Sequence, residues 1–518
     1  MWLYGLATAA VIAVVSAILW AAARQKAING SRPTLPGGHW LWGHARFFAP
    51  IETLHERLIA LARNGPRAVW LRIGPAGPLG ADVVVLNDAT LATALLRMGG
   101  NRAEQDPAAV DDIARVIGTG LISTRGDVWS RRRTVISGHF LSPPALRDYA
   151  PGMAVDAARM AAALVAKASE DGAVGVSSSH DMMLDWLMPY VLGVSLRLTC
   201  GDLPTDLDLR AFMHDLDTVF GEFNVRSFKP CNSLRPTTAA HKAALTRVRR
   251  TIGTVVAQTR QRSESAGDDD AGSGGGSRPT LAAILLDKGA DVYKTNDAVR
   301  DETLLVTFGA YETTAATAAY TLHLLATHPD VQARVRDEVR AATLEAPGRL
   351  GAGTVTPLLD ACVSESMRLY PAAFAVSRRA EVDLRIEAPA TPADPTPCVV
   401  DVPAGTRVLI NGIGISRSPR HWADPDVFRP ERWLAGTDKC ARVTCGSLPF
   451  GGGPRACPGN KLALLEIRTV IAALVDAVEF APDPARPFTC AVRFMLRPDG
   501  PHLLCKPVAR ADTMPTVE

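Results

Sequence analysis

The most informative segment of this 518-residue chain is Phe450-Gly451-Gly452-Gly453-Pro454-Arg455-Ala456-Cys457-Pro458-Gly459. Because glycine has no Cβ atom, the three consecutive glycines let the backbone turn tightly and approach a flat ligand closely. Cys457 precedes Pro458, a residue favoured at the start of a helix, and helical periodicity continues over residues 460–480. A helix N-terminus favours a cysteine thiolate, and a single thiolate on such a loop suits an axial position of haem iron. Without this context, a lone cysteine is more simply a buried thiol.

The complete spacing, Phe-Gly-x-Gly-x-Arg-x-Cys-x-Gly, resembles the haem-binding signature of the cytochrome P-450 superfamily, and this sequence matches every signature position. The resemblance covers the chain from about Pro33 to Lys506. It implies a haem b cofactor whose iron is bound by the Cys457 thiolate, with Phe450 and Arg455 as further cofactor-binding residues. We expect Arg455 to pair with a haem propionate.

Two further segments are similar to the propionate-binding parts of this family. In Trp129-Ser130-Arg131-Arg132-Arg133, residues four apart share one helix face, so Trp129 and Arg133 are expected to reach one propionate. Arg378 falls where the family places another propionate ligand, although its neighbour Arg379 is an alternative for that position.

A structural cluster is predicted from Glu365, Arg368 and Arg432. Glu365 and Arg368 form the Glu-x-x-Arg pattern, which by itself is common on solvated helix faces. The segment Phe428-Arg429-Pro430-Glu431-Arg432-Trp433 adds the third partner that the resemblance implies. Because a buried carboxylate needs bidentate, charged partners, we expect these three side chains to stabilise the fold behind the haem.

The candidate catalytic residues are Thr313 and Glu312, within Gly309-Ala310-Tyr311-Glu312-Thr313-Thr314. This segment is similar to the oxygen-activation motif of the family, with Ala310 in place of a frequent glycine. A threonine hydroxyl can bond the backbone and open the helix groove, and a neighbouring carboxylate can act as a general acid. The alternative is that Thr313 only satisfies a carbonyl and Glu312 forms a surface salt bridge.

The expected fold is mainly α with a minor β portion, in a single large domain after an N-terminal transmembrane helix. Short runs rich in β-branched residues predict strands over 68–73, 82–86, 384–386, 398–402 and 406–410. Apolar periodicity predicts helices near 153–168, 181–196, 238–262, 296–328, 330–344 and 356–370. The catalytic domain is placed at 39–507, with a disordered loop insertion at 263–280 and a C-terminal tail at 508–518.

The N-terminal segment is predicted to be a membrane anchor over residues 1–24, followed by a Pro/Gly hinge over 25–38. From Trp2 to Ala23 no residue is charged, and at ~1.5 Å per residue the run reaches about 33 Å. The basic residues that follow predict a single membrane span with the catalytic domain facing the cytoplasm. The resemblance to microsomal members of the family implies that this membrane is the endoplasmic reticulum. A cleaved signal peptide is the alternative, but the positive region that should precede it is missing.

We therefore interpret the chain as a membrane-bound haem-thiolate monooxygenase of the microsomal type. The formal net charge of +3 argues against a nucleic-acid partner. The resemblance implies electrons from NADPH through a flavoprotein reductase, or from a cytochrome b-type donor, and Arg131, Arg132 and Lys461 are candidate docking residues. The alternative is a reductase-independent isomerase or dehydratase of lipid hydroperoxides, against which the Glu312-Thr313 pair argues.

The substrate is expected to be lipophilic, in the sterol, fatty acid or terpenoid class, and to be delivered from membrane lipids. The residues predicted to form the substrate pocket share an apolar side chain and are Phe308, Ala310, Phe374, Val376 and Phe494.

Overall fold

The computed structural model describes residues 32–39, 42–74, 80–100, 102–172, 178–201, 203–204, 207–227, 237–265, 278–345, 356–390, 395–434 and 446–508. The predicted anchor at 1–24 lies outside these residues. In the described part of the chain, no helix is both long enough and apolar enough to cross a bilayer. The central part of the predicted loop at 263–280 and most of the predicted tail also lie outside the described residues.

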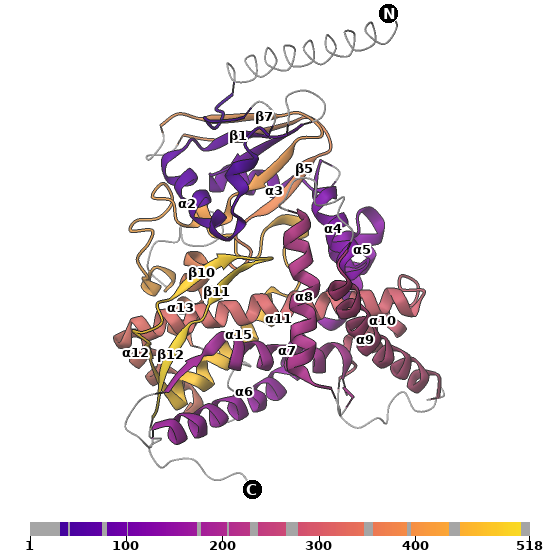
Figure 1. Ribbon diagram of the computed structural model, residues 1–518, viewed down its shortest axis with the longest axis vertical. Helices are drawn as coiled ribbons and strands as arrows, with labels where there is room; N and C mark the ends of the chain where they lie inside the picture. The colour runs from indigo at the N-terminus through magenta and orange to yellow at the C-terminus, as the bar shows by residue number, and fades with distance from the viewer. Residues whose placement is uncertain are drawn as a thin grey trace, which may run out of the picture.

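Helices form most of the described structure (Figure 1). Their bounds are α2 Leu54–Asn64, α3 Ala89–Arg97, α4 Pro107–Ile117, α5 Gly126–Val135, α6 Pro143–Gly172, α7 Met188–Cys200, α8 Leu209–Ser227, α9 Ala239–Ser265, α10 Leu281–Asp287, α11 Asn296–Thr327, α12 Pro329–Glu345, α13 Pro357–Leu369, α14 Gly412–Ser416 and α15 Asn460–Ala477. Each predicted helical segment falls within or overlaps one of these helices. The long helix α6 begins ten residues before the predicted start and accommodates Pro151 in its interior.

In the part of the chain that the structure describes, the strands form four small sheets. Their bounds are β1 Ala68–Ile73, β2 Ala81–Leu86, β3 Ala103–Glu104, β4 Ser178–Asp181, β5 Val376–Ala380, β6 Leu384–Ala388, β7 Cys398–Val402, β8 Arg407–Ile410, β9 Val478–Pro482, β10 Thr489–Val492, β11 Leu496–Asp499 and β12 His502–Pro507. The largest sheet has the order β1-β2-β8-β5-β3, in which only β2 and β8 pair in parallel. All predicted strands are present, whereas β3, β4, β5 and β9 were not predicted.

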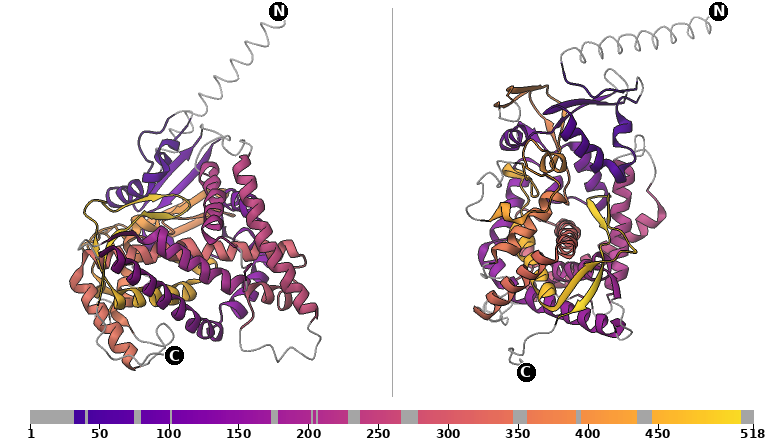
Figure 2. Two further views of the ribbon diagram at one scale, coloured as in Figure 1. Left: turned by 60° about the horizontal axis from the view of Figure 1, so that its bottom comes forward. Right: turned by 90° about the vertical axis from the view of Figure 1, so that its left-hand side faces the viewer.

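The largest sheet and the helices lie in different parts of the molecule (Figure 1). The sheet lies with α2 and α3 in the upper part, and most helices lie below it. Helix α11 runs across the middle of the helical part, and Figure 2 shows it end-on at the centre when the molecule is turned by 90°. Its first turn is capped by the Thr295 hydroxyl, which accepts from the Ala298 N–H at 3.1 Å.

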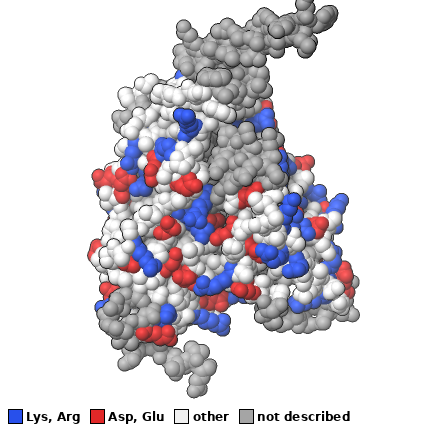
Figure 3. All heavy atoms as spheres, viewed as in Figure 1, with Lys and Arg blue, Asp and Glu red and all other residues white. Residues whose placement is uncertain are grey.

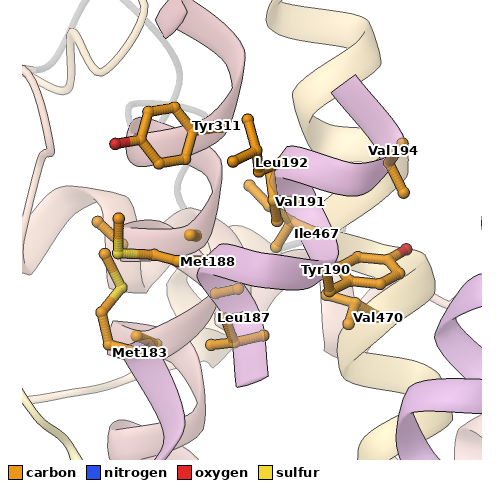
Figure 4. Packing of buried hydrophobic residues seen from close by; sticks show 14 of the residues in the cluster. Met183, Leu187, Met188, Tyr190, Val191, Leu192, Val194, Tyr311, Ile467 and Val470 are labelled. Atoms are coloured by element: carbon orange, nitrogen blue, oxygen red, sulfur yellow. The ribbon is translucent and has the colours of Figure 1, made fainter. Parts of the chain in front are cut away.

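The core of the helical part includes the region where buried side chains of α7, α11 and α15 meet (Figure 4). Val191 and Leu192 on α7 are completely buried, with Tyr311 of α11 on one side and Ile467 of α15 on the other. Burial of apolar side chains drives the association of helices that form few hydrogen bonds with one another. The packing fixes the position of α11, which carries the candidate catalytic residues.

The second half of the predicted hinge is bound to the sheet. Thr34 pairs with Trp70 of β1, and the Leu35 N–H donates to the Trp70 carbonyl at 3.0 Å. The Trp70 N–H in turn donates to the Pro33 carbonyl at 2.8 Å. Residues 33–35 therefore belong to the folded domain and do not form a free connection, because main-chain groups at the sheet edge find partners there.

The surface carries both signs of charge. On the face shown in Figure 3, Lys and Arg residues are interspersed with Asp and Glu residues. This distribution agrees with the net charge of +3 and shows no large field of one sign on that face.

Candidate active site

The backbone conformation of the cysteine loop requires a glycine at position 453. Gly453 has a φ of +67°, and a Cβ atom there would lie 1.9 Å from the carbonyl oxygen of Leu96, the penultimate residue of α3. The Cys457 N–H donates to the Phe450 carbonyl at 2.9 Å, so the loop returns to its own beginning. This closed turn fixes the backbone position of the cysteine.

Helix α15 begins later than the sequence indicates. Its first residue is Asn460, and Gly459 is the N-cap, so Pro458 does not occupy the first helical position. Cys457 therefore stands three residues before the helix. The Gly459 N–H group still favours the thiolate, as does Arg133, but burial by the surrounding protein outweighs them and raises the pKa of the Cys457 thiol. The side chain nevertheless remains accessible on one side, unlike those of Cys362 and Cys505.

Two arginines of the candidate haem site contact the helix and loop that surround it. Arg133 of α5 donates from Nη1 to the Ala456 carbonyl at 2.7 Å, directly beside the cysteine. The Arg455 guanidinium lies 4.1 Å from the ring centroid of Trp129 and donates to the Thr124 carbonyl at 3.0 Å. Trp129 and Arg133, one helical turn apart, therefore both face the cysteine loop, as the Trp-x-x-x-Arg spacing predicts.

The same region holds more positive than negative charge. Arg455 pairs with Glu104 at 2.9 Å. Arg378 is only 6% exposed and donates to the Ser377 carbonyl, and among the described residues no carboxylate lies within ion-pair distance of it. Burial lowers the pKa of Arg378 to about 10. The buried Nε atom of Arg125 has no hydrogen-bond partner in the described part of the chain.

A group bearing carboxylates would satisfy these cations, so the residues present fit the propionates of a haem. Arg378 is preferred over Arg379 for this role. Successive residues of a strand point to opposite faces, and it is Arg378 that interacts electrostatically with Glu104 and Arg455. Arg125 and Glu104 were not predicted, because neither belongs to a recognisable motif.

The structure brings Glu365, Arg368 and Arg432 together. Arg368 donates bidentately to Glu365, at 2.9 Å and 2.8 Å, and the Arg432 Nε donates to it at 2.9 Å. Trp433 adds its indole N–H at 2.7 Å, and the Arg429 backbone N–H adds a fifth hydrogen bond at 3.1 Å. The side chains of Glu365 and Arg368 are fully buried. Burial tends to raise the pKa of Glu365, but the donors from Arg368 and Trp433 outweigh it and the pKa is lowered.

A pocket lies between α4, α8, α11 and the β10–β11 hairpin. Its volume is about 420 Å³ including the open mouth, and it is lined by Ile113, Ile117, Ile122, Phe220, Leu305, Phe308, Gly309, Glu312, Thr313, Phe494 and Met495. Three of these residues form an aromatic cluster, in which Phe220 stacks on Phe308 and both meet Phe494. Of the residues predicted to form the substrate pocket, Phe308 and Phe494 line this pocket, whereas Ala310, Phe374 and Val376 are not among its lining residues.

The candidate catalytic residues face this pocket. Thr313 donates its hydroxyl to the Gly309 carbonyl at 2.9 Å, one turn earlier on α11. Glu312 is only 5% exposed, so the alternative of a surface salt bridge is wrong. Its Oε1 lies 3.7 Å from Nη1 of Arg497, a buried residue of β11.

Arg497 connects Glu312 to a second carboxylate. The same Nη1 atom lies 3.4 Å from Oδ1 of Asp217 on α8, and the Tyr311 hydroxyl donates to that oxygen at 3.3 Å. Burial raises the pKa of Glu312 to about 7, Arg497 opposes this rise, and Asp217 adds to it. The sequence gives no signal for Arg497, because it lies far from α11 along the chain.

An accessible thiol on a glycine loop, surrounding cations and a buried acid beside an apolar pocket have the chemistry of a haem-thiolate oxygenase. The sequence model of the cytochrome P450 family matches residues 33–505. Cytochrome P450 78A1 of Zea mays is 31% identical over 394 residues, which cover 72% of this chain and 67% of that protein. Cytochrome P450 4F2 of Homo sapiens is 26% identical over 475 residues, covering 88% and 86%.

The fold agrees with this match. The crystal structure of the cytochrome P450DA heme domain has a TM-score of 0.73 and 18% identity, covering 92% of this chain and 98% of that one. The chain belongs to the cytochrome P450 family and is a cytochrome P450 monooxygenase. Membership implies a haem with cysteine thiolate ligation.

Proposed function

We propose that this protein is a membrane-bound haem-thiolate monooxygenase in which the Cys457 thiolate would bind the haem iron. The observation that supports this most directly is the loop at 450–459, which closes on itself and leaves the Cys457 side chain accessible. In the reaction, one atom of O₂ enters a lipophilic substrate and the other leaves as water, with two electrons from NADPH and two protons. The haem, when bound, supplies the oxygen activation, and the protein supplies ligand, orientation and protons.

The cofactor is held by residues on three parts of the chain. Trp129, Arg133, Arg378 and Arg455 bind the propionates, with Arg125 as an additional cation, and Phe450 lies at the start of the cysteine loop. Among the described residues no carboxylate lies within ion-pair distance of Arg378, which supports this assignment. Glu365, Arg368 and Arg432 keep the region behind the haem rigid.

Proton delivery is assigned to Glu312 and Thr313. Both face the pocket, and a carboxyl with a pKa of about 7 is well matched to proton transfer near neutral pH. The Thr313 hydroxyl, held by the Gly309 carbonyl, hydrogen-bonds water in the groove and passes the proton on.

The substrate is a lipophilic molecule such as a sterol, fatty acid or terpenoid. Most residues that line the pocket are aliphatic or aromatic, and its polar groups are confined to α11. Residues 1–24 anchor the protein to the endoplasmic reticulum membrane, which delivers such molecules.

The electron donor is an NADPH-dependent flavoprotein reductase, with a cytochrome b-type donor as a second partner. Lys461 is exposed at the start of α15, and Arg131 is about half exposed and pairs with Asp291. These two side chains remain candidate docking residues. Arg132 does not, because it is buried.

The purified protein with haem tests the proposal. The ferrous–CO complex is expected to show the red-shifted Soret band of thiolate ligation, and ¹⁸O₂ with NADPH and reductase is expected to label one oxygen of a lipophilic product. A Soret band at the position of histidine-ligated haem would contradict the proposal. Turnover of lipid hydroperoxides without NADPH, with no labelled product, would instead support the isomerase alternative.

Replacing Arg497 with glutamine is expected to raise the pKa of Glu312 above 7, because a favourable positive charge is removed. The folded-state pKa already exceeds the ordinary value of 4.5, so the stability linked to this group decreases as pH rises through about 7. In Arg497→Gln, this loss of stability should occur at higher pH. The decrease in turnover rate at alkaline pH should move to higher pH as well.

The infrared band of the protonated Glu312 carboxyl, identified by its absence in Glu312→Gln, measures this pKa. Arg486→Gln is the matched control, because Arg486 is exposed and lies on the loop before β10. An unchanged or lowered pKa in Arg497→Gln would show that Arg497 does not act on Glu312.

A further inference from the structure

Arg132 is turned away from solvent, toward the interior of the protein. It is 6% exposed, and its Nη1 atom lies 3.2 Å from Oε2 of Glu302 on α11. The same Nη1 donates to the Thr119 carbonyl at 3.0 Å, and the guanidinium lies 4.8 Å from the ring centroid of Tyr293. The middle arginine of the Trp-Ser-Arg-Arg-Arg segment is therefore a buried contact between α5 and α11.

Glu302 is the centre of this contact. Its side chain is fully buried, and its Oε1 accepts from the Leu121 N–H at 2.9 Å. Its Oε2 accepts from Arg132 and from the Tyr293 hydroxyl, the latter at 3.0 Å. A buried carboxylate is stable only when such donors surround it, so the four groups must keep their positions together.

The segment before α5 is packed tightly against the same part of α11. Gly118 has a φ of +104°, and a Cβ atom there would lie 2.1 Å from the Asp301 carboxylate. A Cβ atom on Gly120 would lie 2.4 Å from the Leu305 side chain. The Thr119 N–H also donates to Asp301. Residues 118–121 therefore have little freedom to slide along α11.

Another side of α5, together with Thr124 just before it, contacts the cysteine loop. Arg133, the residue after Arg132, donates to the Ala456 carbonyl at 2.7 Å. Arg455 donates to the Thr124 carbonyl and lies over Trp129. Adjacent helix positions point about 100° apart, so Arg132 and Arg133 attach one helix to two different elements. A rotation of α5 that broke one contact would move the other.

We propose that Glu302 is a positioning residue for the haem iron ligand: through Arg132 and the Leu121 amide it holds α5 against α11, and thereby holds Arg133 and Trp129 against the Cys457 loop. The inference rests on the proposed ligation of iron by Cys457. Glu302 acts through other residues and is not assigned a chemical step. The Glu302 carboxylate also balances the charge of Arg132, which is adjacent in sequence to Arg133, an arginine that we propose binds a propionate.

The test compares Glu302→Gln with a variant that breaks a buried polar contact at the other end of α11. Gln332 is 1% exposed and joins the Leu325 carbonyl of α11 to the backbone of Phe480 at 3.1 Å and 2.9 Å. Gln332→Leu should lower the melting temperature without touching α5. Tyr293→Phe, which removes only one hydrogen bond to Glu302, is the milder companion variant should Glu302→Gln fold poorly.

In the haem-loaded protein, Glu302→Gln is expected to release haem to apomyoglobin about tenfold faster than the wild type, the lower part of the range for loss of an outer-shell partner. Part of its ferrous–CO complex should lose the thiolate Soret position. Tyr293→Phe should show the same changes to a smaller degree, and Gln332→Leu should show neither.

Two results would overturn the inference. One is a melting temperature lowered as in Gln332→Leu with an unchanged CO spectrum and haem release, which is the behaviour of a stabilising contact alone. The other is that Glu302→Gln and Gln332→Leu change haem release and the ferrous–CO spectrum to the same extent. A wild-type protein without the thiolate band would instead contradict the ligation by Cys457, so the two failures are distinguishable.

Discussion

Cys457→Ser is expected to eliminate the thiolate Soret band of the ferrous–CO complex and to abolish monooxygenase turnover. The loss should exceed the 10- to 100-fold range typical of outer-shell substitutions, about 100-fold or more, because the proposed iron ligand itself is removed. A serine hydroxyl is similar in size to the thiol, so the closed turn from Phe450 to Cys457 should persist. The variant should therefore fold and still present the cations that we propose bind the propionates.

Cys398→Ser is the matched control. Cys398 is a half-buried thiol on β7, and its replacement should leave the spectrum and the turnover unchanged. Far-UV circular dichroism of both variants should match that of the wild type. A Cys457→Ser protein that retained the red-shifted band would show that another residue binds the iron.

The cysteine site was predictable because its determinants are local in sequence. The glycines at 451–453 and the cysteine at 457 lie within one turn, and their geometry follows from the backbone freedom of glycine. What the sequence did not predict is the packing partner of the loop, the end of α3 at Leu96. Nor did it predict the later start of α15, since Pro458 was expected at the first helical position.

The three consecutive arginines show why contacts are harder to predict than helices. Arg131, Arg132 and Arg133 have the same chemistry, and nothing local distinguishes them. In the structure the first is half exposed, the second is buried against Glu302, and the third reaches the cysteine loop. The helical rotation separates their directions, but only the packing of α5 decides which direction is inward.

Strand β5 and Arg497 illustrate the same limit for non-local structure. The sequence of β5, Val-Ser-Arg-Arg-Ala, has little strand character, and the strand forms because β8 and β3 pair with it on both sides. Arg497 reaches Glu312 because the β10–β11 hairpin lies over α11, which places residues about 185 positions apart in contact. Predicting such pairs requires the tertiary fold.

Glu365→Leu is expected to destabilise the protein by about 3–5 kcal/mol, the usual cost of removing one partner from a buried ion pair. The variant leaves Arg368 fully buried without its counter-charge and leaves the Trp433 indole N–H without an acceptor. Because whole domains are stable by only about 5–15 kcal/mol, much of this variant should fail to accumulate as folded protein. Urea unfolding followed by circular dichroism measures the change.

The matched control is Glu387→Gln, which breaks the ion pair with Arg385 on the exposed surface of β6. Its unfolding midpoint should stay close to that of the wild type, because exposed pairs are screened by water. The double variant Glu365→Leu/Arg368→Met removes both charges and should recover part of the lost stability, since the main cost is an unpaired buried cation. A Glu365→Leu midpoint equal to that of the wild type would contradict this account.

The spectrum of the same variant separates a structural role from a chemical one. The donors to Glu365 come from α13 and from the segment around Arg432, and its side chain is fully buried. Any Glu365→Leu protein that folds and retains haem should therefore still show the thiolate Soret band. Loss of that band in protein with native circular dichroism would mean that the cluster acts on the Cys457 ligation directly. The expected pattern, in which stability falls while ligation persists, is the reverse of that expected for Cys457→Ser.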